Sequence, residues 1–134
     1  MNEIDFYKGI NVSITICDNE GTVIYQNEKS AATFGDKTGQ SMLPCHQQRS
    51  QEIIHRLLNE GDTNAYTIEK KGVRKMIYQT PWYNDGVIGG LIEFSIVLPE
   101  TMPHYVREQV KQGGWRRICK PEKHTLPRLI VKFR

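Results

Sequence analysis

Cys45 and His46 are neighbours in the stretch PCHQQRS, and of all the side chains in this sequence theirs are the best suited to bind a metal. A thiolate and an imidazole are ligands of haem iron and of other transition metals, and a thiol can also be oxidised reversibly. Pro44 restricts the backbone that presents them. Because adjacent side chains on an extended chain point in opposite directions, we expect one or the other to be a ligand, not both together. The competing interpretation is a packed or solvated loop.

Catalytic chemistry has no comparable signal. The sequence lacks a nucleophile and base at a suitable spacing, a glycine-rich phosphate loop and an HExxH-type metal motif. Its three cysteines, Cys17, Cys45 and Cys119, are widely spaced and form no CxxC pair, which disfavours a disulfide framework or a structural zinc site. We therefore expect a binding protein that is not an enzyme, with free thiols typical of a reducing compartment.

The composition is that of one globular domain. With 134 residues, 38% of them hydrophobic and 25% charged, the chain can bury one core. No run approaches the ~20 apolar residues that span a bilayer, and the start MNEIDFYKG lacks the basic and apolar regions of a signal peptide. We expect a cytoplasmic protein with no membrane partner.

The charge is unevenly distributed. Residues 1–99 contain nine basic and twelve acidic side chains, whereas residues 100–134 contain nine basic and three acidic ones. This tail contains a basic stretch with one aromatic residue, which can attract nucleic acid phosphates through charge alone: Trp115, Arg116, Arg117, Lys120 and Lys123. No DNA-binding motif accompanies it, so a solvated extension is the competing interpretation. We divide the chain into an N-terminal segment (1–9), a domain (10–100) and a basic C-terminal extension (101–134).

The hydrophobic pattern predicts the elements that position these residues. In VSITIC, residues 12–17, aliphatic side chains alternate with small or polar ones, which predicts a half-buried strand, and DNEG and TVIYQN complete a hairpin. A short helix ending at Gly35 follows, then a loop, then a helix over residues 51–60 with Ser50 as its N-cap and Gly61 at its end. Three strands, NAYTIEK, VRKMIYQTPWY and VIGGLIEFSIVL, are separated by glycine-containing turns.

This order predicts an α+β fold, a five-stranded antiparallel sheet with a helical connector packed on one face. Over residues 10–99 the chain resembles the PAS domain family. The segment ITICDNEGTVIYQNEKSAATFG is similar to the PAS opening, in which a strand reaches Asp-x-x-Gly, a second strand ends at Asn and an Ala-containing helix follows; the matching residues are Asp18, Gly21, Asn27, Ala31 and Ala32. GQSMLPCHQQRSQEIIHRLL resembles a subset of bacterial PAS proteins with a Cys-His loop before the long helix.

The resemblance implies a pocket between the sheet and the long helix, with the loop of Cys45 and His46 beside its entrance. Haem-binding PAS sensors carry their proximal histidine on that helix, which draws attention to His55. At ~100° per residue, however, His55 lies about 130° from the apolar face of its helix and is expected to face solvent or a flank. Further candidates to line a cavity are on the sheet, where each can equally be plain core: Tyr66, Met76, Tyr78, Trp82 and Phe94. Gly89 and Gly90 indicate a sheet bend or room for a ligand ring.

The resemblance therefore implies a stand-alone PAS-type sensory domain that binds a small ligand or haem, or senses redox state, and signals by protein–protein interaction. We expect a homodimer that contacts an unidentified signalling protein. The alternatives are a ligand-free PAS dimerisation module and a transcription-associated regulator that acts through its basic tail. The sequence leaves the cofactor undecided, with haem as the named candidate and His46 or Cys45 as its iron ligand.

Overall fold

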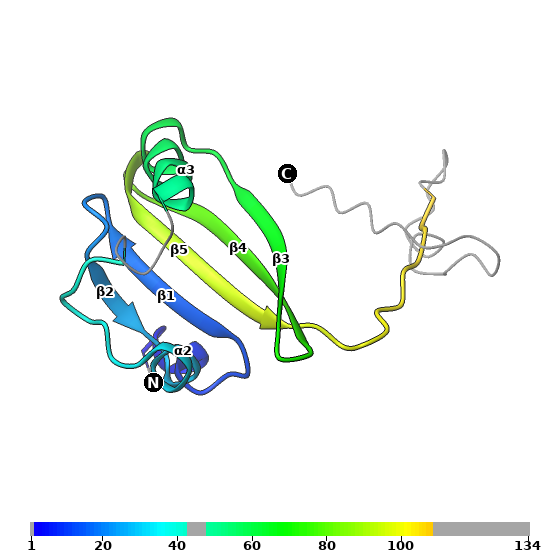
Figure 1. The fold of residues 1–134 in the computed structure, drawn as a ribbon. Helices are drawn as coiled ribbons and strands as arrows, with labels where there is room; N and C mark the ends of the chain where they lie inside the picture. Colours follow the sequence, from blue (N-terminus) through cyan, green and yellow to red (C-terminus); the bar gives the residue numbers. More distant parts are fainter. Residues whose placement is uncertain (1, 43–47, 109–134) are drawn as a thin grey trace. The chain divides into compact units, whose positions relative to one another are not determined.

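The computed structural model describes residues 2–42 and 48–108 of the chain (Figure 1). The chain divides into two units, Met1–Leu98 and Pro99–Arg134. The helices and strands of the described residues belong to the first unit. In chain order they are α1 (Asp5–Lys8), β1 (Ser13–Asp18), β2 (Val23–Gln26), α2 (Glu28–Phe34), α3 (Gln48–Glu60), β3 (Asn64–Lys70), β4 (Val73–Asn84) and β5 (Val87–Val97).

The five strands form one antiparallel sheet with the order β2-β1-β5-β4-β3, which confirms the fold class expected from the sequence. Two-residue turns connect the last three strands. Both turn residues have positive φ, 53° at Lys71 and 77° at Gly72, then 50° at Asp85 and 77° at Gly86. Turns with two positive φ angles match the twist of paired antiparallel strands, so these hairpins are specified locally.

Pro81 lies inside β4, where a proline cannot donate a ladder hydrogen bond. The pairing of β3 with β4 begins at Asn64 and Gln79, so beyond Gln79 one side of β4 has no partner strand. A proline is tolerated at such an edge position.

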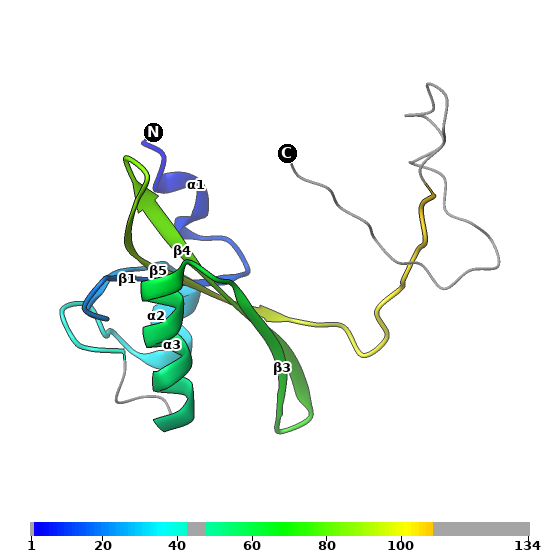
Figure 2. The same ribbon diagram turned by 90° about the horizontal axis from the view of Figure 1, so that it is seen from above.

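The two longer helices cover one face of the sheet. In Figure 2, α2 and α3 lie on one side of the sheet and α1 lies on the other. We call the side of α2 and α3 the inner face and the opposite side the outer face. Ile54, Leu57 and Leu58 of α3 are buried and belong to the same hydrophobic cluster as Cys17 and Leu91 of the inner face.

The start of α3 differs from the prediction. The helix begins at Gln48, so Ser50 is its third residue and not its N-cap. Gln48 and Arg49 are both good helix formers, and nothing in the chain stops the helix after them. The predicted end is confirmed, because Gly61 has φ 78° and its N–H donates to the carbonyl of Leu57 at 2.9 Å.

Burial of β1 also differs from the prediction of a half-buried strand. The small residues Ser13, Thr15 and Cys17 are the buried ones on the inner face, whereas on the outer face Ile14 is 6% exposed and Ile16 is half-buried. The small inner side chains allow α2 to approach closely, since the Thr15 and Ser30 hydroxyl oxygens are 2.6 Å apart. The regular alternation identifies the strand but not which face carries the helices.

Candidate functional site

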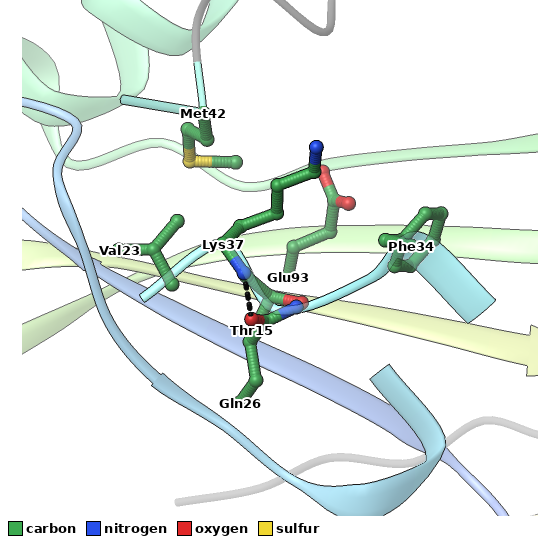
Figure 3. A pocket seen from close by; sticks show the side chains of 7 residues that line it. All are labelled: Thr15, Val23, Gln26, Phe34, Lys37, Met42 and Glu93. Carbon is green, nitrogen blue, oxygen red and sulfur yellow. Dashed lines mark hydrogen bonds between the residues drawn. The ribbon is translucent and has the colours of Figure 1, made fainter. Parts of the chain in front are cut away.

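A cavity of about 300 Å³ lies on the inner face, between the sheet and the connection that follows α2 (Figure 3). Three of the lining residues are apolar, Val23, Phe34 and Met42, and four are polar or charged, Thr15, Gln26, Lys37 and Glu93. The volume is at the lower end of the about 300–1,000 Å³ typical of ligand sites. The cavity therefore has the size and mixed chemistry of a small-ligand site.

A row of polar side chains crosses the inner face at the level of this cavity. Each of the five strands contributes one residue, and each residue is directly opposite the next in the strand register: Asn64 (β3), Gln79 (β4), Glu93 (β5), Thr15 (β1) and Gln26 (β2). Directly opposed residues project from the same face of a sheet. Three members of this polar row, Thr15, Gln26 and Glu93, line the cavity.

Hydrogen bonds orient one half of the polar row toward Glu93. Asn64 Nδ2 donates to Gln79 Oε1 at 3.0 Å, and Gln79 Nε2 donates to Glu93 Oε2 at 2.7 Å. Gln79 is only 2% exposed, so its amide needs both of these partners. An amide nitrogen can only donate, so Gln79 holds the Glu93 carboxylate as an acceptor at the cavity wall.

Gln26 anchors the other end of the polar row. Its Oε1 accepts from the Lys37 backbone N–H at 2.6 Å, and its Nε2 donates to the Ser30 hydroxyl at 2.9 Å and to the Gly35 carbonyl at 3.1 Å. The amide of Gln26 is therefore engaged within the protein at both ends. Its contribution to the site is to hold the connection after α2 in place.

The connection that carries Lys37 and Met42 is also held by its backbone. Gly39 N–H donates to the Val23 carbonyl at 2.8 Å, and Met42 N–H donates to the Gly21 carbonyl at 2.9 Å. At the start of the connection, hydrogen bonds from the backbone and side chain of Thr38 lower the pKa of the Asp36 carboxyl. This wall of the cavity is thus tied to β2.

Glu93 is the one carboxylate among the seven lining residues, and its charge acts on neighbouring groups. Burial raises the pKa of the Cys17 thiol to about 11, and the charges of Asp18 and Glu93 add to the rise against a backbone hydrogen bond at Leu91. Burial and then the charge of Glu93 also raise the pKa of Tyr66. Cys17 is therefore a neutral thiol at physiological pH, which is the unreactive form.

Of the three histidine and cysteine candidates, His55 alone lies among the described residues. Cys45 and His46 lie outside the described residues. His55 is exposed on α3, as its helical position predicts, and it does not line the cavity. Within residues 2–42 and 48–108, no group of three or more His, Cys, Asp or Glu side chains is arranged to hold a metal ion.

None of the candidates on the sheet lines the cavity. Tyr66 is opposite Ile77 on the inner face and is 38% exposed. Met76, Tyr78 and Phe94 alternate with inner-face residues and so project from the outer face. The Tyr78 and Phe94 rings pack edge to face there, with centroids 6.5 Å apart.

Trp82 occupies the room that Gly89 and Gly90 leave in β5. Its indole Nε1 donates to the Cys17 carbonyl of β1 at 2.9 Å, so the ring reaches across β5. A Cβ at Gly89 would overlap the Trp82 ring, and a Cβ at Gly90 would overlap the Cys17 carbonyl. The two glycines thus accommodate a side chain of the protein itself.

Sequence reasoning missed four polar or charged residues of the cavity wall: Thr15, Gln26, Lys37 and Glu93. One of them had a usable signal. Glu93 is the single charged residue in the strand segment VIGGLIEFSIV, and a carboxylate within an otherwise apolar strand is costly unless it has partners. Lys37 lies in a connection with no periodic pattern, so only the tertiary structure brings it to the site.

Comparison with solved structures identifies the fold. The PAS domain of the histidine kinase ThkA matches with a TM-score of 0.54 and 16% identity, covering 65% of this chain and 99% of that one. The Photoactive Yellow Protein domain of the sensor histidine kinase Ppr from Rhodospirillum centenum matches with a TM-score of 0.51 and 18% identity, covering 71% and 92%. The chain has the PAS fold, as its sequence pattern predicts.

A third similar structure is VqmA bound to DPO, with a TM-score of 0.58 and 17% identity, covering 74% of this chain and 58% of that one. A further similar structure is that of the Vibrio cholerae VqmA dimer in the absence of its target DNA, with a TM-score of 0.58 and 16% identity, covering 81% of this chain and 57% of that one. No protein-family model matches the sequence, and no curated protein matches it either. Among the described residues, no helix is long and apolar enough to cross a membrane.

Proposed function

We propose that this protein is a PAS-type sensory domain that binds a small polar molecule in the cavity lined by Lys37 and Glu93 and signals through protein–protein contacts. The observation that carries the proposal is the cavity itself. Its polar residues are positioned by a register that runs through all five strands, and its outer wall is tied to β2. A structurally similar protein, VqmA, is bound to DPO, which supports ligand binding by this fold.

A haem or redox sensor is the alternative that the sequence names. The described cavity wall does not fit haem well, because none of its seven side chains is a histidine or cysteine and its volume is small. The alternative therefore depends on Cys45 and His46, which come between Met42 of the wall and α3 in the sequence. Titrating the protein with hemin tests the haem version of this alternative. A Soret shift that is lost in His46→Ala or Cys45→Ala supports haem binding, and no shift in the wild type excludes haem binding.

We propose a homodimer as the signalling unit, with the outer face of the sheet as its contact surface. This face carries the Tyr78 and Phe94 ring pair, and Tyr78 is 38% exposed. Apolar side chains that gather on one exposed face mark interaction surfaces. A ligand-free dimerisation module is the rival function from another class, and it predicts dimerisation without any ligand effect.

The basic extension provides a further candidate contact. Residues 100–134 carry nine basic and three acidic side chains, and contact with nucleic acid through such a segment weakens steeply with salt. A salt-sensitive gel shift that disappears when residues 113–134 are removed would support this role. A shift that survives the truncation would exclude the tail.

The ligand proposal is tested by retention of small molecules from a metabolite extract, measured by native mass spectrometry. Lys37→Trp fills the cavity with an indole, and Thr38→Trp places the same indole on the exposed neighbouring residue that does not line it. We expect the wild type and Thr38→Trp to retain a bound small molecule and Lys37→Trp to lose it. Equal retention by both variants, or no retention by the wild type, would contradict the proposal.

A further inference from the structure

The two edges of the sheet differ in how they are covered. At the β2 edge, the Val23 N–H donates to the Gln40 carbonyl and the Gly39 N–H donates to the Val23 carbonyl, both at 2.8 Å, so the connection after α2 lies along the strand. The opposite edge is β3, the outermost strand on its side of the sheet in Figure 1. Residues 65–70 of β3 are all exposed, and within the described part of the chain β4 is the strand's one pairing partner. We call this free side of β3 the open edge.

The strand register determines which backbone groups of β3 face the open edge. The Leu98 N–H donates to the Arg74 carbonyl at 2.9 Å, so Arg74 is bonded toward β5. The backbone groups of successive residues in a strand point to alternate sides, so Val73 and every second residue after it are bonded toward β3. Their partners in the register are Asn64, Tyr66, Ile68 and Lys70. The N–H and C=O groups of the remaining β3 residues therefore point to the open edge: Ala65, Thr67 and Glu69.

The strand lacks the features that protect an edge from pairing with another chain. It contains no proline, and its seven residues pair with β4 in a continuous register without a bulge. Its charged side chains are at the last two positions, Glu69 and Lys70. Unpaired N–H and C=O groups along such a regular strand are a template for another extended chain. The open edge can therefore accept one more strand.

Two exposed apolar side chains lie beside the open edge on the inner face. Tyr66 and Ile68 are 38% and 40% exposed. Because their backbone groups are bonded to β4, both residues take non-hydrogen-bonded positions against an added antiparallel strand, where opposed side chains come closest. An added strand buries both side chains when it places an apolar residue opposite each of them. The edge therefore fits an extended segment with apolar residues at alternate positions.

The charge at one end of the open edge distinguishes between the possible occupants. The hairpin sequence EKKGVRK, residues 69–75, holds four basic side chains and one acidic one, and Lys70 lies on the inner face with Ile68. A second copy of this chain that pairs antiparallel about Thr67, and so bonds all the open groups, places the neutral Asn64 opposite Lys70. A partner segment with a carboxylate at this position compensates the basic charge. Charge complementarity therefore favours an acidic partner segment over a second copy.

We infer that the open edge binds an extended segment of a partner protein as a sixth, antiparallel strand of the sheet. The segment has apolar residues opposite Tyr66 and Ile68 and an acidic residue opposite Lys70. This inference rests on the protein–protein signalling of the proposed function, and it specifies the surface and the chemistry of the partner. It uses neither the ligand cavity nor the outer-face dimer.

A synthetic peptide with this pattern, Glu-Thr-Val-Thr-Ile-Thr-Gln with blocked ends, tests the inference on the full chain. In the antiparallel register its glutamate is opposite Lys70, its valine opposite Ile68 and its isoleucine opposite Tyr66. One control peptide has proline as its central residue, which removes the N–H opposite Thr67. A second control peptide has lysine in place of the glutamate.

Two protein variants test the same contacts from the other side. Thr67→Pro removes the central N–H of the open edge without removing a bond to β4, and proline is tolerated at such a position. Its matched control is Thr67→Val, which keeps the N–H. Lys70→Met removes the charge opposite the peptide glutamate, and Lys8→Met on the exposed helix α1 is its matched control.

We expect isothermal titration to show that the peptide binds the wild type and both control variants, and that Thr67→Pro binds it roughly tenfold or more weakly. The reason is that proline removes a hydrogen bond and leaves a peptide carbonyl without a partner. Proline in the peptide should have a similar effect. Lys70→Met should weaken binding of the glutamate peptide roughly two- to fivefold and should not weaken binding of the lysine peptide. Absence of binding to the wild type, or equal affinity for all three peptides, overturns the inference.

Amide hydrogen exchange measured by NMR identifies the edge directly. Saturating peptide should slow exchange of the Ala65, Thr67 and Glu69 N–H groups, because these groups gain hydrogen bonds. The N–H groups of Tyr66 and Ile68 are already bonded toward β4 and should change less. Protection that lacks this alternation, or that appears on another element, contradicts pairing at the open edge.

Two further measurements separate the possible failures. If light scattering shows that Thr67→Pro lowers the mass of the protein and Thr67→Val does not, a second copy occupies the open edge and the inference is wrong. The cavity variant Lys37→Trp should bind the peptide as the wild type does. If the wild type fails to bind the peptide but retains a small molecule that Lys37→Trp loses, this inference fails and the proposed ligand-binding function stands.

Discussion

Asn27 is a single residue that connects three parts of the fold. Its Oδ1 accepts from the backbone N–H groups of Ile14 and Ser30, both at 3.0 Å. Its Nδ2 donates to the carbonyls of Tyr7 at 3.0 Å and Val12 at 2.7 Å. The residue is 1% exposed, so these four bonds satisfy its amide in place of water. Asn27 thus caps α2 and also holds the chain before β1.

Substitution of Asn27 can separate these two roles. Asn27→Asp keeps an acceptor for the two N–H groups but places an oxygen against the two carbonyls, whereas Asn27→Ala removes all four bonds. We expect Asn27→Ala to lower the free energy of unfolding by about 3 kcal/mol, from a lost cap and buried groups left without partners. Urea denaturation measures this, with Glu28→Gln on the exposed neighbouring residue as control. A loss under ~1 kcal/mol in Asn27→Ala would contradict the network.

Cys17 makes stability depend on pH in the alkaline range. Its pKa rises from an ordinary 9.0 to about 11 in the folded protein. A raised thiol pKa means that the folded state holds the Cys17 proton more tightly than the unfolded state does. The protonated thiol therefore contributes fully to the free energy of unfolding below about pH 9, and this contribution is lost as the pH rises to about 11. We expect the wild type to lose roughly 2 kcal/mol more than Cys17→Ala over this range. Parallel pH-dependent denaturation of the two proteins tests it, and parallel curves would refute it.

At the scale of elements, β4 and β5 fit together because the Trp82 ring of β4 packs against Gly89 and Gly90 of β5. Trp82 of β4 reaches over β5 to the Cys17 carbonyl of β1. The contact therefore links three neighbouring strands and reinforces the register that aligns the polar row. A bulge in the pairing of β4 with β5 lies between Trp82 and Tyr83.

The two glycines should respond differently when the indole is removed. The three atoms nearest to a Cβ at Gly89 all belong to the Trp82 ring, so we expect Gly89→Ala to cost about 1–3 kcal/mol in the wild type and much less in a Trp82→Ala background. Gly90→Ala meets the Cys17 carbonyl and Asp18 Cα as well as Trp82, so its cost should persist in that background. Double-mutant cycles by thermal denaturation measure both couplings. Absence of coupling between Gly89 and Trp82 would show that the ring is not what requires Gly89.

At the scale of the whole molecule, the first unit has an inner face that α2 and α3 cover (Figure 2). The cavity lies on this inner face, and the Tyr78 and Phe94 ring pair lies on the outer face. The same strands contribute to both faces, and Glu93 and Phe94 are adjacent in β5 with side chains on opposite sides. In the proposed function, these shared strands are the connection between a ligand at the inner face and a partner at the outer face.

A matched pair of substitutions tests the proposed dimer. Tyr78 of the outer face and Ile68 of the inner face are 38% and 40% exposed. In a dimer formed through the outer face, Tyr78→Glu buries an unpaired charge and should shift the mass toward the monomer, while Ile68→Glu should leave it unchanged. Light scattering after size-exclusion chromatography reports the mass. Dissociation by Ile68→Glu alone would assign the contact to the inner face.

The sequence by itself determined the order of the five strands and of the helices α2 and α3, and the form of the last two hairpin turns, but it did not predict the short helix α1. Local features suffice for these: periodic apolar residues identify the strands and α3, and glycine turns such as Lys71-Gly72 specify hairpins whatever surrounds them. The position of Ser50 inside α3 shows the usual limit, because residues that tolerate helix do not mark where it begins.

Only the tertiary structure decided the candidate site. The polar row forms only when all four strand pairings are in register. It aligns Glu93 with Thr15 and Gln26, which are more than sixty residues earlier in the sequence. A period of two places residues on alternate faces but does not say which face the helices cover. Because the face was undecided, the sequence could not show that Met76, Tyr78 and Phe94 lie on the outer face. It also could not show that the Trp82 ring packs against Gly89 and Gly90. Lys37 lies at the cavity because a hydrogen bond to Gln26 holds the connection after α2 in place, and that connection has no periodic sequence pattern.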